Sequence, residues 1–476
     1  MKYKFIVVFP LVLFLLCISS LNGQTKYWSL QECIDLAYEK NITIKQSELQ
    51  LENSNIDKSA AKANFFPNIN ASANHSWNYG LNQNITTGIL ENITTQFSSM
   101  AINFGVDLYK GLQNIKKLHR ANLSIIADQY NIDDIKDDIG LLVANSYLQI
   151  MFNREILSVQ KQQLEVSIKE LDRTRLLIDA GILVEGDLYD IEASLATQEQ
   201  TLIQAENAYR LTKINLAQLL LITDYNNFEI SNENYNVPFT KILEEKPKDI
   251  FAKAISQRND IKRLVTNLEI AETDIEIAKG GLQPSISAFY GYSSRISYSD
   301  RLERSGEFNT VPIGYVGSTG DPVLTQIENT KIATPLSVAD QLGINDGHNF
   351  GIQLSIPIFN RLLAKNNVKR SEINLEIAKN QFEQQKLDLE NTINQAYNNT
   401  SAAYKFYQAT KKTVLARIDS YQNAKNKFEA GIIDSYDYAQ IKQRYESAVS
   451  DEVRAKYDYI FKLKVLEFYF GLKLEI

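Results

Sequence analysis

Cysteine is scarce in this sequence, and its scarcity excludes a disulfide-stabilised fold. The chain of 476 residues contains two cysteines, Cys17 and Cys33. Cys17 lies in an apolar stretch that resembles a secretory leader, so the mature chain is expected to keep one thiol, with which no internal disulfide can form. Cys33 is expected to be a small buried residue of the first helix. Stability must then come from packing or assembly.

Long apolar runs are also lacking, apart from one at the N-terminus. Lys2 and Lys4 precede an apolar stretch from Phe5 to Ile18, and Ser19 to Gly23 is small and polar. This order predicts a signal peptide at 1–23. A membrane anchor is the alternative, but about fourteen apolar residues are short for a span. No other run is long enough, so no transmembrane helix is predicted in the mature chain.

Motifs of enzyme chemistry and metal binding are missing as well. The three histidines, His75, His119 and His348, are not spaced for a metal, and no Gly-x-Ser-x-Gly or phosphate-binding Gly-Lys-Ser/Thr motif occurs. The carboxylates lie between lysines, which is the usual pattern of a solvated helix face. A formal net charge of −7 argues against a nucleic-acid partner. We predict no enzyme, no catalytic residue, no metal and no cofactor.

Residues that break helices are rare near the C-terminus. No proline follows Pro357, and Gly431 is the only glycine between positions 351 and 471. Because proline and glycine are the residues that most often stop helices, the range 362–470 is predicted as two long helices with a turn at 430–437. Apolar residues recur there at three- and four-residue steps, as in a coiled coil. The first of these helices alone would reach roughly 100 Å.

Between Pro67 and Tyr109 the apolar period changes to two. Two runs of about ten residues alternate apolar with small polar side chains, and a polar loop separates them. The apolar positions are Ile69, Ala71, Ala73, Trp77 and Tyr79, then Met100, Ile102, Phe104, Val106 and Leu108. Such runs, with aromatic residues near their ends, are typical of transmembrane β-strands. A soluble amphipathic hairpin alternates equally well, so this hairpin alone leaves both interpretations open.

The same order of elements occurs twice. Pro-Asn-Ile-Asn-Ala at 67–71 returns as Pro-Ser-Ile-Ser-Ala at 284–288, an offset of 217, and Ala-Gly-Ile at 180–182 returns at 430–432, an offset of 250. The offset grows between the strands of the second hairpin, which places the extra residues in a loop at 299–347. Long loops at one end of the strands are typical of membrane barrels. We predict an internal duplication.

Each half is therefore predicted as a helix, two strands, a long helix, a turn and a returning helix. The predicted boundaries in chain order are a signal peptide at 1–23; a first repeat at 24–221 with β-hairpin 67–109 and helical tip 180–187; a connector at 222–250; and a second repeat at 251–476 with β-hairpin 284–359, loop 299–347 and helical tip 430–437.

Four strands are too few to close a barrel, and open sheet edges are not tolerated in lipid. If the strands are membranous, several chains must contribute to one barrel. Three copies would supply twelve strands, an even number, and would bring their helices together in the same way. The predicted fold class is an α+β membrane protein with four strands per chain, a trimeric 12-stranded β-barrel and a long α-helical coiled-coil barrel.

This ordered set of features resembles the TolC family of outer-membrane efflux proteins, from about Tyr27 to Gly471. The residues that carry the resemblance are Leu30-x-x-x-Ile34-x-x-Ala37, the prolines Pro67 and Pro284 that open strands, Pro357-Ile358-Phe359, and two turns with Gly181 and Asp187 or Gly431 and Asp437. The resemblance implies a homotrimeric channel in the outer membrane of a Gram-negative bacterium, with helices extending into the periplasm. It also implies two partners, a periplasmic adaptor (membrane fusion protein) and an inner-membrane transporter.

The resemblance further implies roles for the tips of the helical hairpins. Asp437 and Gln440 fall where relatives narrow the lumen with acidic residues. The predicted adaptor-contacting residues are Gly181, Ile182, Leu183, Asp187, Gly431, Ile432, Ile433 and Asp437. The aromatic and arginine positions that tie the closed mouth together in relatives correspond to Phe428 and Ile433 here, so those polar ties cannot form in the same way. From the residues alone, both aspartates could instead cap the helices that follow the turns, and the two roles are compatible.

The predicted function is an outer-membrane exit duct of a tripartite efflux pump, passively conducting small molecules from the periplasm to the exterior. One alternative is the exit channel of type I protein secretion. Another is an exported coiled-coil scaffold, although a fibrous scaffold needs no duplicated β-insertion. A periplasmic adaptor would need further β-rich domains, and only four strands are evident.

Overall fold

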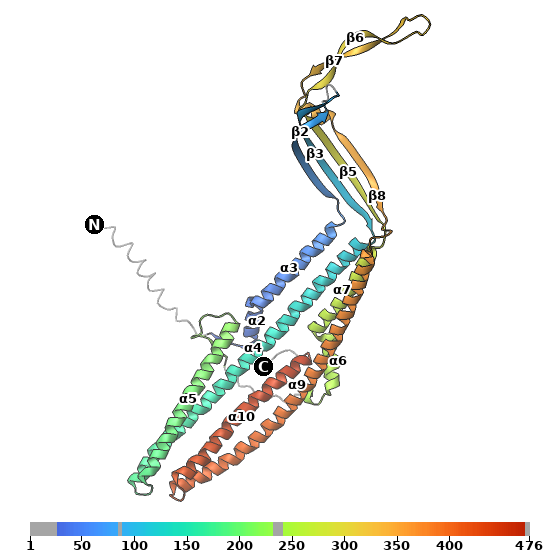
Figure 1. Ribbon diagram of the computed structural model, residues 1–476. Helices are drawn as coiled ribbons and strands as arrows, with labels where there is room; N and C mark the ends of the chain where they lie inside the picture. Colours follow the sequence, from blue (N-terminus) through green and yellow to red (C-terminus); the bar gives the residue numbers. More distant parts are fainter. Residues whose placement is uncertain (1–25, 84–87, 232–240, 472–476) are drawn as a thin grey trace, which may run out of the picture. The chain divides into compact units, whose positions relative to one another are not determined.

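The structure is a computed structural model that describes residues 26–83, 88–231 and 241–471. The predicted signal peptide and part of the predicted connector lie outside the described residues. The chain forms two compact units, each described by itself below. The first consists of the residues up to Ser54, Ser124–Leu268 and those from Glu376 onward. The second consists of Asn55–Leu123 and Glu269–Leu375 (Figure 1).

Four long helices dominate the chain: α4 (Gln113–Asp179), α5 (Glu185–Leu219), α9 (Leu363–Glu429) and α10 (Ser435–Tyr469). The last two occupy the range that the sequence predicted as helical, since nothing but the turn at Gly431 interrupts it. In the described residues no helix combines the length and apolar content that a bilayer span requires.

The shorter helices are α2 (Leu30–Lys40), α3 (Ile42–Ala63), α6 (Pro247–Gln257) and α7 (Asn259–Gly280). Ser29 and Glu32 form a capping box at the start of α2. The chain breaks between α2 and α3 at Asn41. Its side-chain oxygen accepts hydrogen bonds from the backbone nitrogens of Thr43 and Ile44, at 2.8 and 3.3 Å, and so caps α3.

The core of the first unit consists of apolar clusters between these helices. One gathers around α2, where Cys33 is fully buried, as predicted, among residues of α4, α5 and α10. A short parallel pair, β1 (Tyr27–Trp28) and β4 (Glu229–Ile230), closes over it. A second cluster joins α6 and α7 to α9 and α10. Burial of these side chains holds the helices together.

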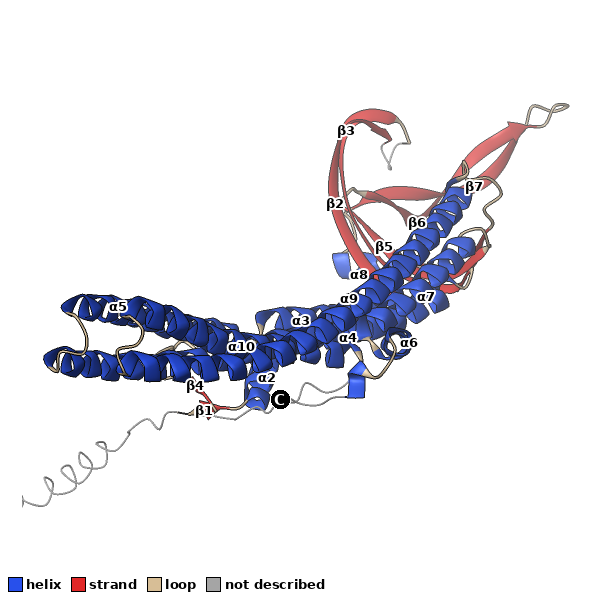
Figure 2. Cartoon of the chain, turned by 90° about the horizontal axis from the view of Figure 1, so that it is seen from below, coloured by secondary structure: helices blue, strands red, loops and turns tan. Residues whose placement is uncertain are grey.

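A four-stranded antiparallel sheet forms the second unit, in the order β2 (Asn68–Gln83), β3 (Leu90–Lys110), β5 (Ser285–Ser297) and β8 (Gly347–Ser355). The four strands occupy the two predicted hairpins, except that β3 extends one residue further, to Lys110, and β3 pairs with β5 to join the hairpins. The strands bend along their length (Figure 2).

The two faces of this sheet differ sharply in polarity. The register places apolar and aromatic side chains on one face, including Ile69 of β2, Phe104 of β3, Tyr290 of β5 and Phe350 of β8. The opposite face carries mainly asparagine, serine and glycine, with Phe289 of β5, between Gly105 and Gly351, as an aromatic exception. It includes Asn70, Ser72 and Asn74 of β2, Asn103 and Gly105 of β3, Ser287, Gly291 and Ser293 of β5, and Asn349 and Gly351 of β8. The predicted alternation therefore continues across all four strands.

The segment 299–347, expected as a loop, is instead largely ordered. It contains a β-hairpin of β6 (Arg301–Tyr315) and β7 (Pro322–Ala333), followed by the short helix α8 (Val338–Ile344). Glycines and prolines obscured the strands in the sequence, because each strand contains them at bulges or ends. Figure 1 shows this hairpin extending beyond the four-stranded sheet, at the end of the strands opposite the start of α4.

Candidate functional site: the helical hairpin tips

The first tip joins α4 to α5 through a turn that only glycine adopts easily. Gly181 has a φ of 72°, in the left-handed region. Its backbone nitrogen donates to the carbonyl of Ile178 at 2.8 Å, and that of Ile182 donates to Leu177 at 2.9 Å. These two bonds form a Schellman motif, which ends α4 with its last carbonyls satisfied.

The second tip, between α9 and α10, repeats this geometry. Gly431 has a φ of 68° and donates to the carbonyl of Phe428 at 2.9 Å, while Ile432 donates to Lys427 at 2.9 Å. The surroundings of the two glycines differ. A Cβ added to Gly181 would meet nothing within 4 Å, whereas one added to Gly431 would lie 3.2 Å from Cγ2 of Ile182. The two tips therefore touch at Gly431.

The two tip aspartates have different environments. Asp187 is buried, and its carboxylate accepts from the backbone nitrogen of Val184 at 3.1 Å and from that of Ser435, in the other tip, at 3.2 Å. It thus contributes to the start of α5 and links the tips. Asp437 is exposed, and its own backbone nitrogen donates to Asp434, which caps α10. Asp187 therefore acts in part as a cap of α5, whereas α10 is capped by Asp434 and not by Asp437.

The remaining predicted tip residues divide into exposed and packed ones. Ile182 and Ile432 are 51% and 69% exposed, and Gly181 and Gly431 are exposed beside them. Leu183 and Ile433 instead pack against the apolar cluster behind the tips. That cluster contains Leu171, Ile191, Ala424, Phe428 and Tyr438. Gln440 is half-buried and donates to the hydroxyl of Tyr436 at 2.7 Å.

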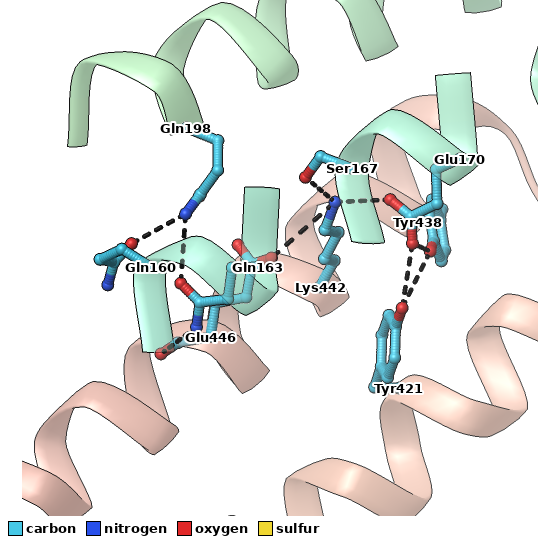
Figure 3. A network of polar contacts seen from close by, with 9 residues as sticks. All are labelled: Gln160, Gln163, Ser167, Glu170, Gln198, Tyr421, Tyr438, Lys442 and Glu446. Atoms are coloured by element: carbon cyan, nitrogen blue, oxygen red, sulfur yellow. Dashed lines mark hydrogen bonds and ion pairs between the residues drawn. The ribbon is translucent and has the colours of Figure 1, made fainter. Parts of the chain in front are cut away.

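A buried ionic cluster lies just behind the tips and joins α4 to α10 (Figure 3). Lys442 donates to Glu170 at 2.5 Å and to the hydroxyl of Ser167 at 2.8 Å. Lys442 and Glu170 are only 5% and 8% exposed. Glu446, one turn further along α10, lies 3.8 Å from the Lys442 ammonium. One buried ammonium therefore faces two carboxylates.

Two tyrosines complete this ionic cluster. The hydroxyl of Tyr421 on α9 donates to Glu170 at 2.9 Å, and that of Tyr438 on α10 donates to the same carboxylate. Burial, and then the charge of Glu170, raise the pKa of both hydroxyls, so both remain protonated donors. The ring of Tyr438 stacks on Phe428 with centroids 4.7 Å apart. Glu170 thereby holds residues of α9 and α10 against α4.

Sequence reasoning missed this ionic cluster. It treated the carboxylates of the helices as a solvated face, and for Glu170 this is wrong, because the side chain is buried. A signal was present: Tyr438, Lys442 and Glu446 follow one another at four-residue steps along one side of α10.

A polar groove of about 590 Å³ continues from the ionic cluster between α5 and α10. Gln160, Gln163 and Gln198 line it, and the side-chain nitrogen of Gln198 donates to the side-chain oxygens of Gln160 at 2.8 Å and of Gln163 at 3.3 Å (Figure 3). Gln440, Asp451 and others line its walls. The described residues hold no group of three or more histidines, cysteines or carboxylates placed to bind a metal.

Comparison with known proteins decides the family. The model of the outer membrane efflux protein family matches residues 33–220 and 251–472. The chain belongs to the outer membrane efflux protein family. The resemblance drawn from the sequence is thereby confirmed. The family consists of channels of the Gram-negative outer membrane with a helical periplasmic part, not of enzymes.

Individual relatives of this outer membrane efflux protein are distant in sequence. The cation efflux system protein CusC of Escherichia coli K12 is 20% identical over 293 residues, covering 59% of each chain. The outer membrane protein TolC of the same strain is 22% identical over 325 residues, covering 67% of this chain and 58% of TolC. The alignments thus span less than two thirds of the length of these curated relatives.

The fold is shared over a larger part of the chain. A crystal structure of CusC has a TM-score of 0.74 at 15% identity and covers 93% of this chain and 92% of its own. The outer membrane protein VceC of Vibrio cholerae has a TM-score of 0.72 at 14% identity and covers 94% and 97%. At these identities the likeness concerns the fold alone.

Proposed function

We propose that three copies of this chain form an outer-membrane exit duct through which a tripartite efflux pump releases small molecules. The observation that carries the proposal is the two-faced sheet. One face is apolar and aromatic, which suits lipid, and the other offers amide and hydroxyl groups, which suit a water-filled lumen. Within the described residues β2 and β8 each leave one edge unpaired. Such edges need strands from neighbouring copies in a membrane.

An internal duplication is supported by the helix bounds. α9 begins and ends 250 residues after α4, at Leu363 against Gln113 and at Glu429 against Asp179. α10 follows α5 at the same interval, and so do the left-handed residues Gly431 after Gly181 and Gly471 after Leu221. Two equivalent halves per chain would give a trimer six similar helical hairpins around its axis, each with the same turn at its end.

The tips are proposed as the periplasmic end of this duct. Asp437, whose carboxylate is exposed while Asp434 caps α10, and Gln440 are the proposed constriction residues. A ring of like charges would make such a narrow mouth attract cations. Adaptor contact is proposed for the exposed apolar residues Ile182 and Ile432, and the buried Asp187 is proposed to support them by linking the tips.

Gene deletion with complementation tests this function. Cells that lack the chain are expected to become sensitive to a panel of dyes and antibiotics, and the native chain is expected to restore resistance. Ile432→Asp should abolish both the resistance and cross-linking to the adaptor, because a charge replaces an exposed apolar contact at the tip. Ile344→Asp is the matched control, since Ile344 is 67% exposed at the end of α8 and should leave both unchanged.

The same strains separate the rival functions. If resistance is unaffected by deletion while particular proteins disappear from the growth medium, the duct serves type I protein secretion. If neither changes and the protein remains outside the membrane fraction, the scaffold interpretation replaces the duct.

A further inference from the structure

The β6–β7 hairpin has two apolar faces that nothing in the described chain covers. In the half that contains the turn, residues 308–327, the register places Phe308, Leu324 and Tyr315 on one face and Val323 and Ile327 on the other. All five are exposed, from 43% for Val323 to 70% for Tyr315. A two-stranded hairpin with no packed face is only marginally stable in water. Some partner must therefore cover both of its sides.

We propose that the hairpins of neighbouring copies pack on one another, with the Phe308 face of one copy against the Ile327 face of the next. The proposal rests on the proposed trimer. Copies in a ring touch through two different surfaces of each chain, one for each neighbour. A hairpin that is apolar on both sides fits that arrangement, whereas a membrane or a separate protein lying on one side would need only one apolar face.

Charge and continuity favour the same occupant. Residues 308–327 include a single charged residue, Asp321, so copies can approach without strong repulsion. Most of the charges at 301–307 and 328–333 are paired inside the hairpin: Arg304 lies 3.6 Å from Glu328, and Glu303 lies 3.4 Å from Arg301 and 3.9 Å from Lys331. The hairpin also connects β5 to β8. The open edge of β8 is one of the two sheet edges that strands of neighbouring copies are proposed to pair with.

Cysteine cross-linking in the intact outer membrane tests this contact. Phe308 and Ile327 lie at the same height on opposite faces, because Phe308 pairs with Glu328 and Ile327 with Asn309. The double variant Phe308→Cys/Ile327→Cys, treated with a short bismaleimide, is expected to give a covalent trimer. Each single variant is the matched control and should give none, since its cysteine would face a residue without a thiol.

The native thiol should not interfere with this experiment. Cys33 is fully buried, and burial raises its pKa to about 12, so it should react little with maleimides. The mass of the detergent-extracted protein is measured on the same samples, because it separates the hairpin contact from the trimer itself.

Each other outcome has a defined meaning. A trimer mass without cross-links, with both cysteines reactive toward a water-soluble maleimide, would overturn the contact and leave the trimer standing. A trimer mass with both cysteines shielded but not cross-linked would assign the cover to lipid or to another protein, and would also overturn it. A monomer mass would overturn the trimer and the contact together.

Discussion

Replacing Lys442 by alanine is expected to destabilise the helical unit by about 3 kcal/mol. The substitution leaves the buried carboxylate of Glu170 without its ammonium partner, and an unpaired buried charge is strongly unfavourable. We expect a loss of stability at the lower end of the range for broken buried ion pairs, because Tyr421 and Tyr438 still donate hydrogen bonds to Glu170. The measurement is thermal loss of the helical circular dichroism signal of the detergent-extracted protein.

Two variants sharpen this prediction. Lys462 pairs with Asp458 at 2.7 Å on the helix surface, so Lys462→Ala should change stability by about 0.5 kcal/mol or less. The double variant Lys442→Met/Glu170→Gln removes both charges, while the amide oxygen can still accept from the tyrosines, and should recover at least half of the loss. Equal melting of the Lys442→Ala and Lys462→Ala proteins would contradict the buried pair.

Stability should also fall as the pH rises through neutrality, because of Glu446. Burial raises the pKa of this carboxyl from 4.5 to about 7; Lys442 lowers it less than burial raises it, and Glu170 raises it further. Because this pKa is higher in the folded than in the unfolded chain, protonation of Glu446 favours the folded state, and the stabilisation is complete below about pH 4.5. That stabilisation is lost as the pH rises through about 7, and the loss between pH 6 and 8 should be about 1 kcal/mol.

Glu446→Gln should remove this dependence on pH, since the amide does not titrate. A second buried carboxyl must be separated from it. Burial and the nearby Asp260 raise the pKa of Asp134 to about 6, so Asp134→Asn should change the lower part of the pH profile only. If the native and Glu446→Gln proteins melt with the same dependence between pH 6 and 8, the ionic cluster does not hold the proton assigned to it.

The long helices and the sheet strands were predictable because they depend on local rules. The range of α9 and α10 contains no proline and only one glycine, Gly431, so the two long helices could be predicted from composition. The alternation of apolar and polar residues along β2, β3 and β5 indicates a sheet with one apolar and one polar face. The capping box of Ser29 and Glu32 is likewise a matter of three-residue spacing.

The buried ionic cluster and the unequal aspartates could not be predicted in the same way, because they depend on which helices meet. Glu170 and Lys442 are 272 residues apart, and each reads as a solvated helix residue until α4 and α10 pack. Asp187 and Asp437 hold equivalent places in the two turns, yet only Asp187 faces the other tip. The β6–β7 hairpin was missed for another reason: its glycines and prolines are typical of loops, and the register that pairs its strands contains two irregularities.

Ion conductance of the detergent-purified protein in a planar bilayer tests the proposed duct most directly, with the native chain compared with Asp437→Ala. A three-chain pore with Asp437 at its narrow end predicts stepwise conductance that prefers cations in the native protein, and larger, less cation-selective steps in the variant. Trimers that are verifiably inserted but conduct in neither form would contradict an open duct, and protein that never inserts would contradict the membrane barrel itself.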